Sequence, residues 1–235
     1  MKDIAASGGR WLDVAPGRFP GWIASFAERH GVPESGVPLT AVVSPTGESA
    51  TFAAPDGAIA ECHPPFPPVR AAAGLAGHPA EYADALAAHA LAPRTVGVLL
   101  VRLGGYAAGI FTGSPPVLAA SKTGSRLVHG RSAAGGWSQH RFARRREKQA
   151  AEALQAAASA AAEVFGRLGG SPLDAVVLGG DKRTVAGLRD EPRLAPYLDL
   201  AVERFLTVPD PRLAVLKDTP RLFLAVRIRL MEPAS

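Results

Sequence analysis

The chain has 235 residues, 47% of them hydrophobic and 20% charged, and its formal net charge at pH 7 is +5. These figures predict an ordinary soluble globular protein of one or two domains that is moderately basic without being a polycation. A single cysteine, Cys62, excludes an internal disulfide framework and a cysteine-rich zinc module.

Targeting and membrane segments are not recognisable in the sequence. The N-terminus, MKDIAASGGRW, lacks the apolar core of a secretory signal, and no stretch approaches the ~20 continuous apolar residues of a membrane span. We therefore expect a cytoplasmic protein with no membrane partner, and we expect a monomer.

The first 92 residues predict a small α+β region. Residues 16–31 hold apolar side chains at helical spacing and stop at a glycine, which is typical of a short amphipathic helix. Three β-prone runs, separated by the turn sequences PTG and PDG, favour a three-stranded meander. These runs are residues 39–44, 48–54 and 58–63. A helix over residues 80–91 then leads to a boundary, so residues 1–92 are expected to be separate from residues 93–235.

The second region opens with strands that favour antiparallel pairing. Residues 95–103 form a buried-looking apolar run, and residues 106–113 return after a Gly-Gly turn. We expect two further runs, residues 117–122 and 126–131, to continue the antiparallel set around a turn at Thr123-Gly124.

A long helix is predicted from Ser138 to about Leu168, because this segment is rich in alanine and contains no proline. Small and apolar side chains fall on one stripe, and charged or polar side chains fall on the opposite face. The apolar stripe consists of Ala143, Ala150, Leu154, Ala157, Ala161, Val164, Phe165 and Leu168. The opposite face carries Arg141, Arg144, Arg145, Lys148, Glu152 and Gln155.

Strand and helix candidates alternate after the long helix. They are a strand at residues 174–180, a helix at residues 181–191, and strands at residues 200–208 and 221–230. Together with the earlier strands, this order predicts a mixed sheet flanked by helices, an α/β or α+β three-layer core.

The usual catalytic motifs are missing. The histidines show no HExxH or paired-ligand spacing, and the sequence has neither a G-x-S-x-G elbow nor a Walker loop. We therefore expect no metal site, and we interpret Cys62 as a packed small hydrophobe. The Gly179-Gly180 pair before Lys182 and Arg183 could form an anion-binding turn, but we favour a purely structural turn between strand and helix.

Residues 129–148, HGRSAAGGWSQHRFARRREK, give the strongest functional signal. The arginines lie in the first turns of the predicted helix, where the helix dipole disfavours positive charge unless anions such as phosphates compensate it. A solvated helix face is the alternative interpretation. Trp137 is suited either to stacking on an unpaired base or to packing in a core.

Gln139 follows the Gly135-Gly136 pair and falls in the first turn of the predicted helix. It could be an ordinary first-turn residue behind a Ser138 cap. Paired glycines, however, can bring backbone N–H groups close to a substrate, and a neutral amide can hold a water in line with an ester carbonyl. This chemistry suits an activated ester whose other catalytic groups come from elsewhere.

The same stretch resembles the catalytic loop and helix of the class I release factors of eukaryotes and archaea, His-Gly-Arg-Gly-Gly-Gln-Ser, two residues, then Arg-Phe-Ala-Arg. The matching positions are His129-Gly130-Arg131, Gly135-Gly136, Ser138, Arg141-Phe142-Ala143-Arg144, Arg146 and Lys148, with Ser132-Ala133-Ala134 as an insertion. The release-factor glutamine falls on Trp137. Gly136-Trp137-Ser138-Gln139 fits the Gly-x-x-Gln of the Vms-like release factors, and the sequence resembles the actinobacterial-type branch of that family.

This resemblance implies an RNase H-like catalytic domain over residues 93–235, with a loop at residues 130–139. It implies hydrolysis of the ester between nascent peptide and tRNA on stalled large ribosomal subunits, with the ribosome and peptidyl-tRNA as partners and no cofactor. Gln139 would position the water or its oxyanion, and Gly135 and Gly136 would permit the loop conformation. The RNA-contacting residues would be Arg131, Trp137, His140, Arg141, Arg144, Arg145 and Lys148.

Two other functions remain open at this point. Cleavage of tRNA near its 3′ end, with which eukaryotic Vms-type proteins have been associated, would leave the peptide on a short nucleotide fragment. A non-catalytic ribosome- or RNA-binding module would keep the basic helix, and Trp137 in the release-factor glutamine position would then report lost catalysis.

Overall fold

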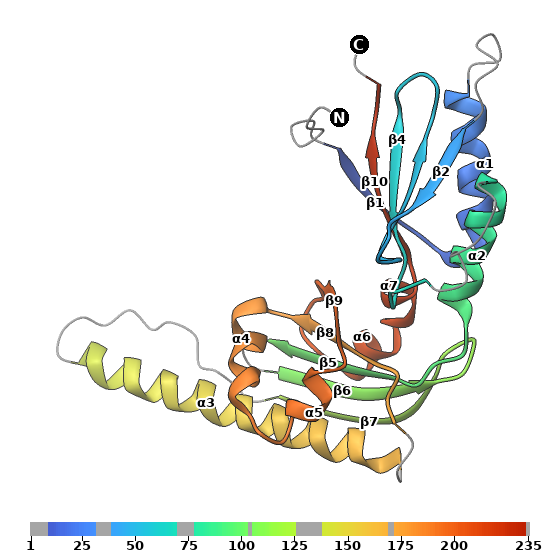
Figure 1. The fold of residues 1–235 in the computed structure, drawn as a ribbon. Coiled ribbons are helices and arrows are strands. Elements are labelled where there is room, and N and C mark those ends of the chain that lie inside the picture. Colours follow the sequence, from blue (N-terminus) through green and yellow to red (C-terminus); the bar gives the residue numbers. More distant parts are fainter. Residues whose placement is uncertain are drawn as a thin grey trace. The chain divides into compact units, whose positions relative to one another are not determined.

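The computed structural model describes residues 9–31, 39–69, 78–102, 105–125, 138–168 and 172–233, and for residues 138–150 and Leu168 the description is limited to the backbone. The chain divides into two compact units. One is Met1–Ala92 together with Arg221–Ser235, and the other is Pro93–Pro220 (Figure 1). Among the described residues, no helix is both long enough and apolar enough to span a membrane.

The first unit is a five-stranded sheet in the order β1-β10-β4-β3-β2, with antiparallel pairing throughout. Its strands are β1 (Arg10–Val14), β2 (Thr40–Val43), β3 (Ala50–Ala53), β4 (Ile59–His63) and β10 (Val226–Met231). Its helices are η1 (Pro16–Arg18), α1 (Phe19–His30) and α2 (Pro79–Leu91), and α7 (Pro220–Phe223) precedes β10.

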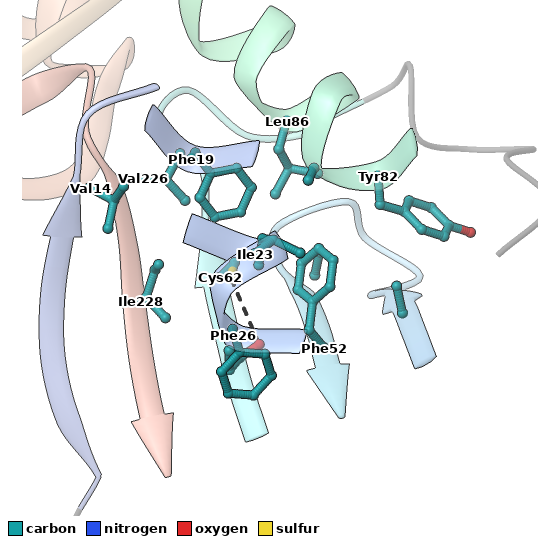
Figure 2. Close-up of a cluster of buried hydrophobic side chains, with 14 of the residues drawn as sticks. Val14, Phe19, Ile23, Phe26, Phe52, Cys62, Tyr82, Leu86, Val226 and Ile228 are labelled. Carbon is teal, nitrogen blue, oxygen red and sulfur yellow. Dashed lines mark hydrogen bonds between the residues drawn. The ribbon is translucent and has the colours of Figure 1, made fainter. Parts of the chain in front are cut away.

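One face of this sheet carries the core of the unit. Phe19, Ile23 and Phe26 repeat at helical spacing along α1 and are buried against the sheet (Figure 2). Alternate residues of the strands meet them, including Phe52 of β3 and Ile228 of β10. Full burial of each such side chain contributes roughly 1.5–3 kcal/mol, so these contacts determine which face of the sheet α1 covers.

The second unit is a mixed five-stranded sheet in the order β7-β6-β5-β8-β9. Its strands are β5 (Val96–Arg102), β6 (Gly105–Thr112), β7 (Val117–Ser125), β8 (Ala175–Gly180) and β9 (Ala201–Leu206). Its helices are α3 (Ser138–Phe165), η3 (Gly166–Leu168), α4 (Lys182–Ala186), η4 (Gly187–Asp190), α5 (Ala195–Leu198) and α6 (Leu213–Lys217). Strand β6 is antiparallel to both β5 and β7, whereas β8 is parallel to β5 and to β9.

Most of the predicted elements are present. The first helix, the three-stranded meander, the helix ending at Leu91 and the long helix beginning at Ser138 all occur where the sequence placed them. The long helix becomes a 3-10 turn after Phe165. Strand β1 was not predicted. It is a five-residue strand at the edge of the sheet, and its apolar and polar residues alternate too weakly to distinguish it from a loop.

Two predictions about strands were wrong. We expected a turn at Thr123-Gly124, but β7 continues through both residues and pairs with β6 as far as Ser125. The second of the two expected strands, residues 126–131, lies outside the described residues. We also expected one strand over residues 221–230, but Pro220–Phe223 is the helix α7 and the strand starts only at Val226.

The C-terminal strand also differs in its place from the expected domain division. We expected residues 93–235 to form one domain, whereas Arg221–Ser235 group with the first unit, where β10 pairs with β1 on one side and with β4 on the other. Residues 93–220 are therefore inserted between two segments that share a sheet. Pairing between strands so distant in sequence leaves no local signal in either of them.

Candidate functional site

The candidate loop connects the end of β7 at Ser125 to the start of α3 at Ser138. Because β6 is antiparallel to both of its neighbours, β7 runs in the same direction as β5, β8 and β9. The loop therefore leaves the sheet at the edge where all four of these strands have their carboxyl ends. In open α/β sheets this is the edge at which ligands bind.

The predicted site residues lie largely outside the described part of the chain. Residues 126–137 are not described, so the positions of Arg131, Gly135, Gly136 and Trp137 remain predictions. For residues 138–150 the backbone alone is described. Six predicted residues belong to this segment, namely Gln139, His140, Arg141, Arg144, Arg145 and Lys148.

The helix backbone nonetheless determines how these six positions are arranged. Because α3 begins at Ser138, Gln139 and His140 lie in its first turn, directly after the loop. Residues three and four apart share one face of an α-helix. Arg141, Arg144, Arg145 and Lys148 have this spacing, so their positions form one stripe along the first turns of α3.

The C-terminal half of α3 is anchored on the second sheet. Ala157, Ala161 and Val164 are buried in the core that this helix shares with β5 and β6. Phe165 lies against Gly97 near the start of β5, and Leu154 packs beside Gly187, which follows α4. The helix therefore runs along the sheet from its carboxyl edge back towards the start of β5, and Figure 1 shows the N-terminal turns of α3 lying beyond the sheet.

An ion-pair cluster adds to this anchor. Glu163 of α3 accepts hydrogen bonds from Lys122 of β7 and from Arg167 Nη2, the latter at 2.6 Å. These two hydrogen bonds, with Lys122 contributing most, lower the pKa of Glu163 below its ordinary value. All three side chains are half-exposed, so the cluster helps to fix the position of the helix more than it adds to overall stability.

The entry to the loop is shaped by a glycine opposite a tyrosine. Gly124 pairs with Tyr106 across β7 and β6, and a Cβ at Gly124 would lie 2.5 Å from the tyrosine ring. Any side chain here would displace Tyr106, which packs partly against the core beneath α3. Gly124 therefore lets the strand run straight to Ser125, where the loop begins.

The Gly179-Gly180 pair has a structural explanation. Gly180 has a φ of +107°, and a Cβ at this position would overlap the carbonyl oxygen of Val101 on β5. Asp181 caps α4 by accepting hydrogen bonds from the backbone N–H and the hydroxyl of Thr184, at 2.8 and 2.6 Å. A carboxylate thus already occupies the helix N-terminus, and this favours the structural turn over an anion site.

Asp181 has a depressed pKa for the same reasons. The hydroxyl and N–H of Thr184 contribute most, and the positive charges of Arg102 and Arg183 lower the pKa further. Arg102 stands at the carboxyl end of β5, where its Nη1 donates to the carbonyl of Val208 at 2.8 Å and its Nε lies 3.9 Å from Asp210. The sequence signal for this residue is a charge at the end of a continuous apolar strand.

The described residues contain no group of three or more His, Cys, Asp or Glu side chains that could hold a metal ion. Cys62 is fully buried in the core of the first unit, and burial strongly raises the pKa of its thiol. Its S–H points to the carbonyl of Ala60 (Figure 2). This agrees with the interpretation of Cys62 as a packed small hydrophobe, because a nucleophile requires an accessible thiolate.

Comparison with protein families decides the relationship. A family described as the Actinobacteria/chloroflexi VLRF1 release factor matches residues 94–229, which is more than half of the chain. The chain belongs to this family. The match starts two residues before β5, covers all of the second unit except Pro93 and ends within β10. The resemblance to the actinobacterial-type branch is therefore confirmed.

Comparisons with solved structures and with curated proteins give weaker evidence than the family match. The Vms1 mitochondrial localization core aligns with 12% identity and a TM-score of 0.37, over 80% of this chain and 77% of that one. The archaeal translation termination factor aRF1 aligns with 10% identity and a TM-score of 0.40, over 91% of this chain and 66% of that one. Both TM-scores are below 0.5, so the assignment rests on the family match. A comparison with curated proteins gave no match.

Proposed function

We propose that this member of the VLRF1 family hydrolyses the ester between a nascent peptide and tRNA on stalled large ribosomal subunits. Family membership supports the reaction class. The observation that carries the proposal is that α3 begins at Ser138, because this places Gln139 in the first turn of a helix at the end of a Gly-Gly loop.

The proposed chemistry divides the work between this chain and the ribosome. Gln139 holds the attacking water in line with the ester carbonyl, and backbone N–H groups near Gly135 and Gly136 stabilise the developing oxyanion. A neutral amide is too weak a base to take the proton, so the remaining catalytic groups come from the ribosomal site and from the tRNA itself. The chain requires no cofactor in this scheme.

The long helix presents this loop to RNA. Residues 138–153 of α3 span about 24 Å at the rise of an α-helix, and Figure 1 shows the first turns of this helix passing beyond the sheet. The stripe of Arg141, Arg144, Arg145 and Lys148 binds phosphates of ribosomal or transfer RNA, with Arg131, Trp137 and His140 as neighbouring contacts. Phosphates would offset the unfavourable placement of cations at a helix N-terminus.

The fold of the second unit is consistent with this role. Three sequentially adjacent antiparallel strands followed by two parallel ones, in the order β7-β6-β5-β8-β9, support the RNase H-like fold that the resemblance implies. We propose that this unit is the catalytic domain. Its partners would be the large ribosomal subunit and peptidyl-tRNA in the cytoplasm, and the protein would act as a monomer.

The decisive experiment measures peptide release from isolated large subunits that carry peptidyl-tRNA. The native protein should release free peptide and leave an intact tRNA end on a gel, whereas Gln139→Ala should reduce the release rate by about 10²- to 10³-fold, as expected for losing one positioned polar group. Gln155→Ala is the matched control, because Gln155 is an exposed glutamine on the same helix. This variant should release peptide at the native rate.

Other outcomes would replace the proposal. Peptide that remains attached to a short nucleotide fragment would identify a tRNA nuclease. Normal binding without release by either the native protein or the variant would identify a binding module. Equal release by the native protein and Gln139→Ala would remove Gln139 from the site.

A further inference from the structure

Helices cover one face of the sheet of the first unit, and no described element of this unit covers the other, which we call the open face. Val226, Ile228 and Leu230 of β10 belong to the core, to which α1 and α2 also contribute side chains. Figure 1 shows α1 and α2 on the same side of this sheet. The residues between them, Arg227 and Arg229, point to the opposite face and are exposed or half-buried. None of the residues proposed for the peptide-release site belongs to this face.

Trp11 is the most conspicuous residue on the open face. Its side chain is 48% exposed, although tryptophan is usually well buried. The guanidinium of Arg227 lies over the indole at 4.6 Å from the ring centroid, and the ring of His63 lies 5.5 Å away at 45°. A cation–π contact of this kind holds the ring in a fixed orientation while part of it remains exposed.

The charges around Trp11 alternate in sign. The strand register places Arg229 directly opposite Trp11 and Glu61 opposite Arg229, and it places Asp13 opposite Arg227. Glu61 also lies 3.3 Å from Nε2 of His63. A surface that binds only phosphates would be uniformly positive. Here hydrogen-bond donors and acceptors surround one aromatic ring.

Such a combination is complementary to a nucleobase. An aromatic ring on an open sheet provides a stacking platform, and guanidinium and carboxylate groups match the acceptors and donors on the edges of an unpaired base. We infer that the open face around Trp11, Arg227 and Arg229 binds single-stranded RNA by stacking a base on Trp11. The choice of RNA as the partner rests on the proposed function, since a factor that acts on peptidyl-tRNA works among exposed RNA.

The proposed RNA contact at Trp11 and the proposed RNA contact of α3 depend on different forces. The α3 stripe would bind phosphates and release counterions, which makes its binding strongly dependent on salt. Stacking on Trp11 would strengthen binding roughly tenfold to hundredfold and add little salt dependence. The two RNA contacts can therefore be separated by measurement, even in the intact protein.

Tryptophan fluorescence tests the inference directly. The chain has three tryptophans, so Trp22→Phe together with Trp137→Phe leaves Trp11 as the only indole. A short single-stranded RNA of mixed sequence should quench this fluorescence. Inorganic polyphosphate, which has the charge of RNA but no bases, should leave it unchanged. Quenching by polyphosphate to the same extent, or no quenching by RNA while anisotropy shows the RNA to be bound, would overturn the inference.

Affinity measurements give a second test. Trp11→Leu should weaken binding of the same RNA roughly tenfold to hundredfold without changing the salt slope, and Trp11→Phe should retain most of the affinity. The matched control is Val42→Thr, because Val42 is 65% exposed on the far edge strand of the same sheet. If Trp11→Leu reduced ribosome binding but not RNA binding, the surface would bind protein and the inference would be wrong.

The result is independent of catalysis. Quenching of Trp11 without peptide release would remove the proposed function and keep the RNA contact. Peptide release without quenching would support the proposed function and overturn the RNA contact at Trp11.

Discussion

His30 joins three parts of the first unit through its two ring nitrogens. It is the last residue of α1, and its Nδ1 lies 2.9 Å from Asp56 in the turn between β3 and β4, while its Nε2 lies 3.7 Å from Glu232 after β10. The N–H of Ala58 contributes most to lowering the pKa of Asp56 below 3.8, followed by the hydrogen bond to His30. The ionised carboxylate is therefore the form that the fold favours.

This arrangement predicts a specific loss of stability in acid. A carboxyl group with a lowered pKa in the folded state stabilises the protein above its ordinary pKa, and this contribution disappears as the pH falls through the lowered value. The difference in free energy of unfolding between the native protein and Asp56→Asn should thus have its full value above pH 3.8 and decrease below it. Urea unfolding at a series of pH values measures this difference.

The control for that comparison is Asp84→Asn, an exposed carboxylate on α2. It should leave the dependence of stability on pH close to that of the native protein. If Asp56→Asn also followed the native protein at every pH, the hydrogen bonds to Asp56 would contribute nothing to folding.

The burial of a single residue could be predicted from the sequence where the residue type alone indicates it. Cys62 was predicted to be a packed hydrophobe and is fully buried. The roles of Gly124 and His30 were not predictable, because each depends on a partner that only the register or the turn geometry brings close. Trp11 was missed for a related reason, since an exposed tryptophan looks the same in a sequence as a buried one.

At the level of single elements, β7 shows how one glycine can mislead a prediction. Gly124 suggested a turn, but its lack of a side chain makes room for Tyr106 on the neighbouring strand. Gly124→Val should displace that ring and lower the free energy of unfolding by roughly 1–3 kcal/mol, as for other overpacked sites. Thermal or urea unfolding measures the loss, and Gly113→Ala, at a turn with a φ of +84°, gives the comparison for backbone strain alone.

The double variant Gly124→Val with Tyr106→Ala distinguishes packing from backbone effects. Adding Gly124→Val to Tyr106→Ala should lower the free energy of unfolding by less than adding it to the native protein, because the clash with the tyrosine ring is then absent. A full loss in the double variant would mean that β7 itself requires glycine.

The α3 stripe leads to a prediction about salt. Converting Arg141, Arg144 and Arg145 to Ala should weaken RNA binding and flatten the plot of log affinity against log salt, by about one unit for each lost phosphate contact. Removing an equal charge elsewhere, with Arg18, Arg189 and Arg212 converted to Ala, is the control because all three are exposed outside α3. An unchanged slope in the α3 variant would favour a solvated helix face.

Most helices and strands could be predicted because their signals are local. Alanine content and the absence of proline were sufficient to predict that α3 is a long helix, and turn sequences were sufficient to separate β2, β3 and β4. Strand β10 was predicted only in part, since the helix α7 occupies the start of the same apolar run. The resemblance that led to the family depended on a short motif around residues 129–148, which is a local signal of the same kind.

At the level of the whole molecule, the insertion of Pro93–Pro220 between two segments of one unit predicts how fragments behave. Residues 93–220 should fold alone. Residues 1–92 should not, because they lack β10, which fills the place between β1 and β4 and contributes three core side chains. Joining residues 1–92 to residues 221–235 by a short flexible linker should restore cooperative unfolding, as measured by circular dichroism.

The same linker joined to a scrambled copy of residues 221–235 controls for length and composition. That fragment should behave like residues 1–92 alone. Cooperative unfolding of residues 1–92 without any β10 sequence would show that the remaining strands form a stable sheet by themselves.

The position of β10 also determines when the protein can mature. Chains emerge from the ribosome N-terminus first, and domains tend to fold as they appear. The inserted unit can fold while synthesis continues, but the sheet that contains β1 and β4 is incomplete until residues 226–231 have been made. A copy whose own translation stalled before that point would contain the candidate catalytic loop but an incompletely folded first unit. The first unit is thus completed only after residues 226–231 have been synthesised, although most of its strands precede the whole second unit in the chain.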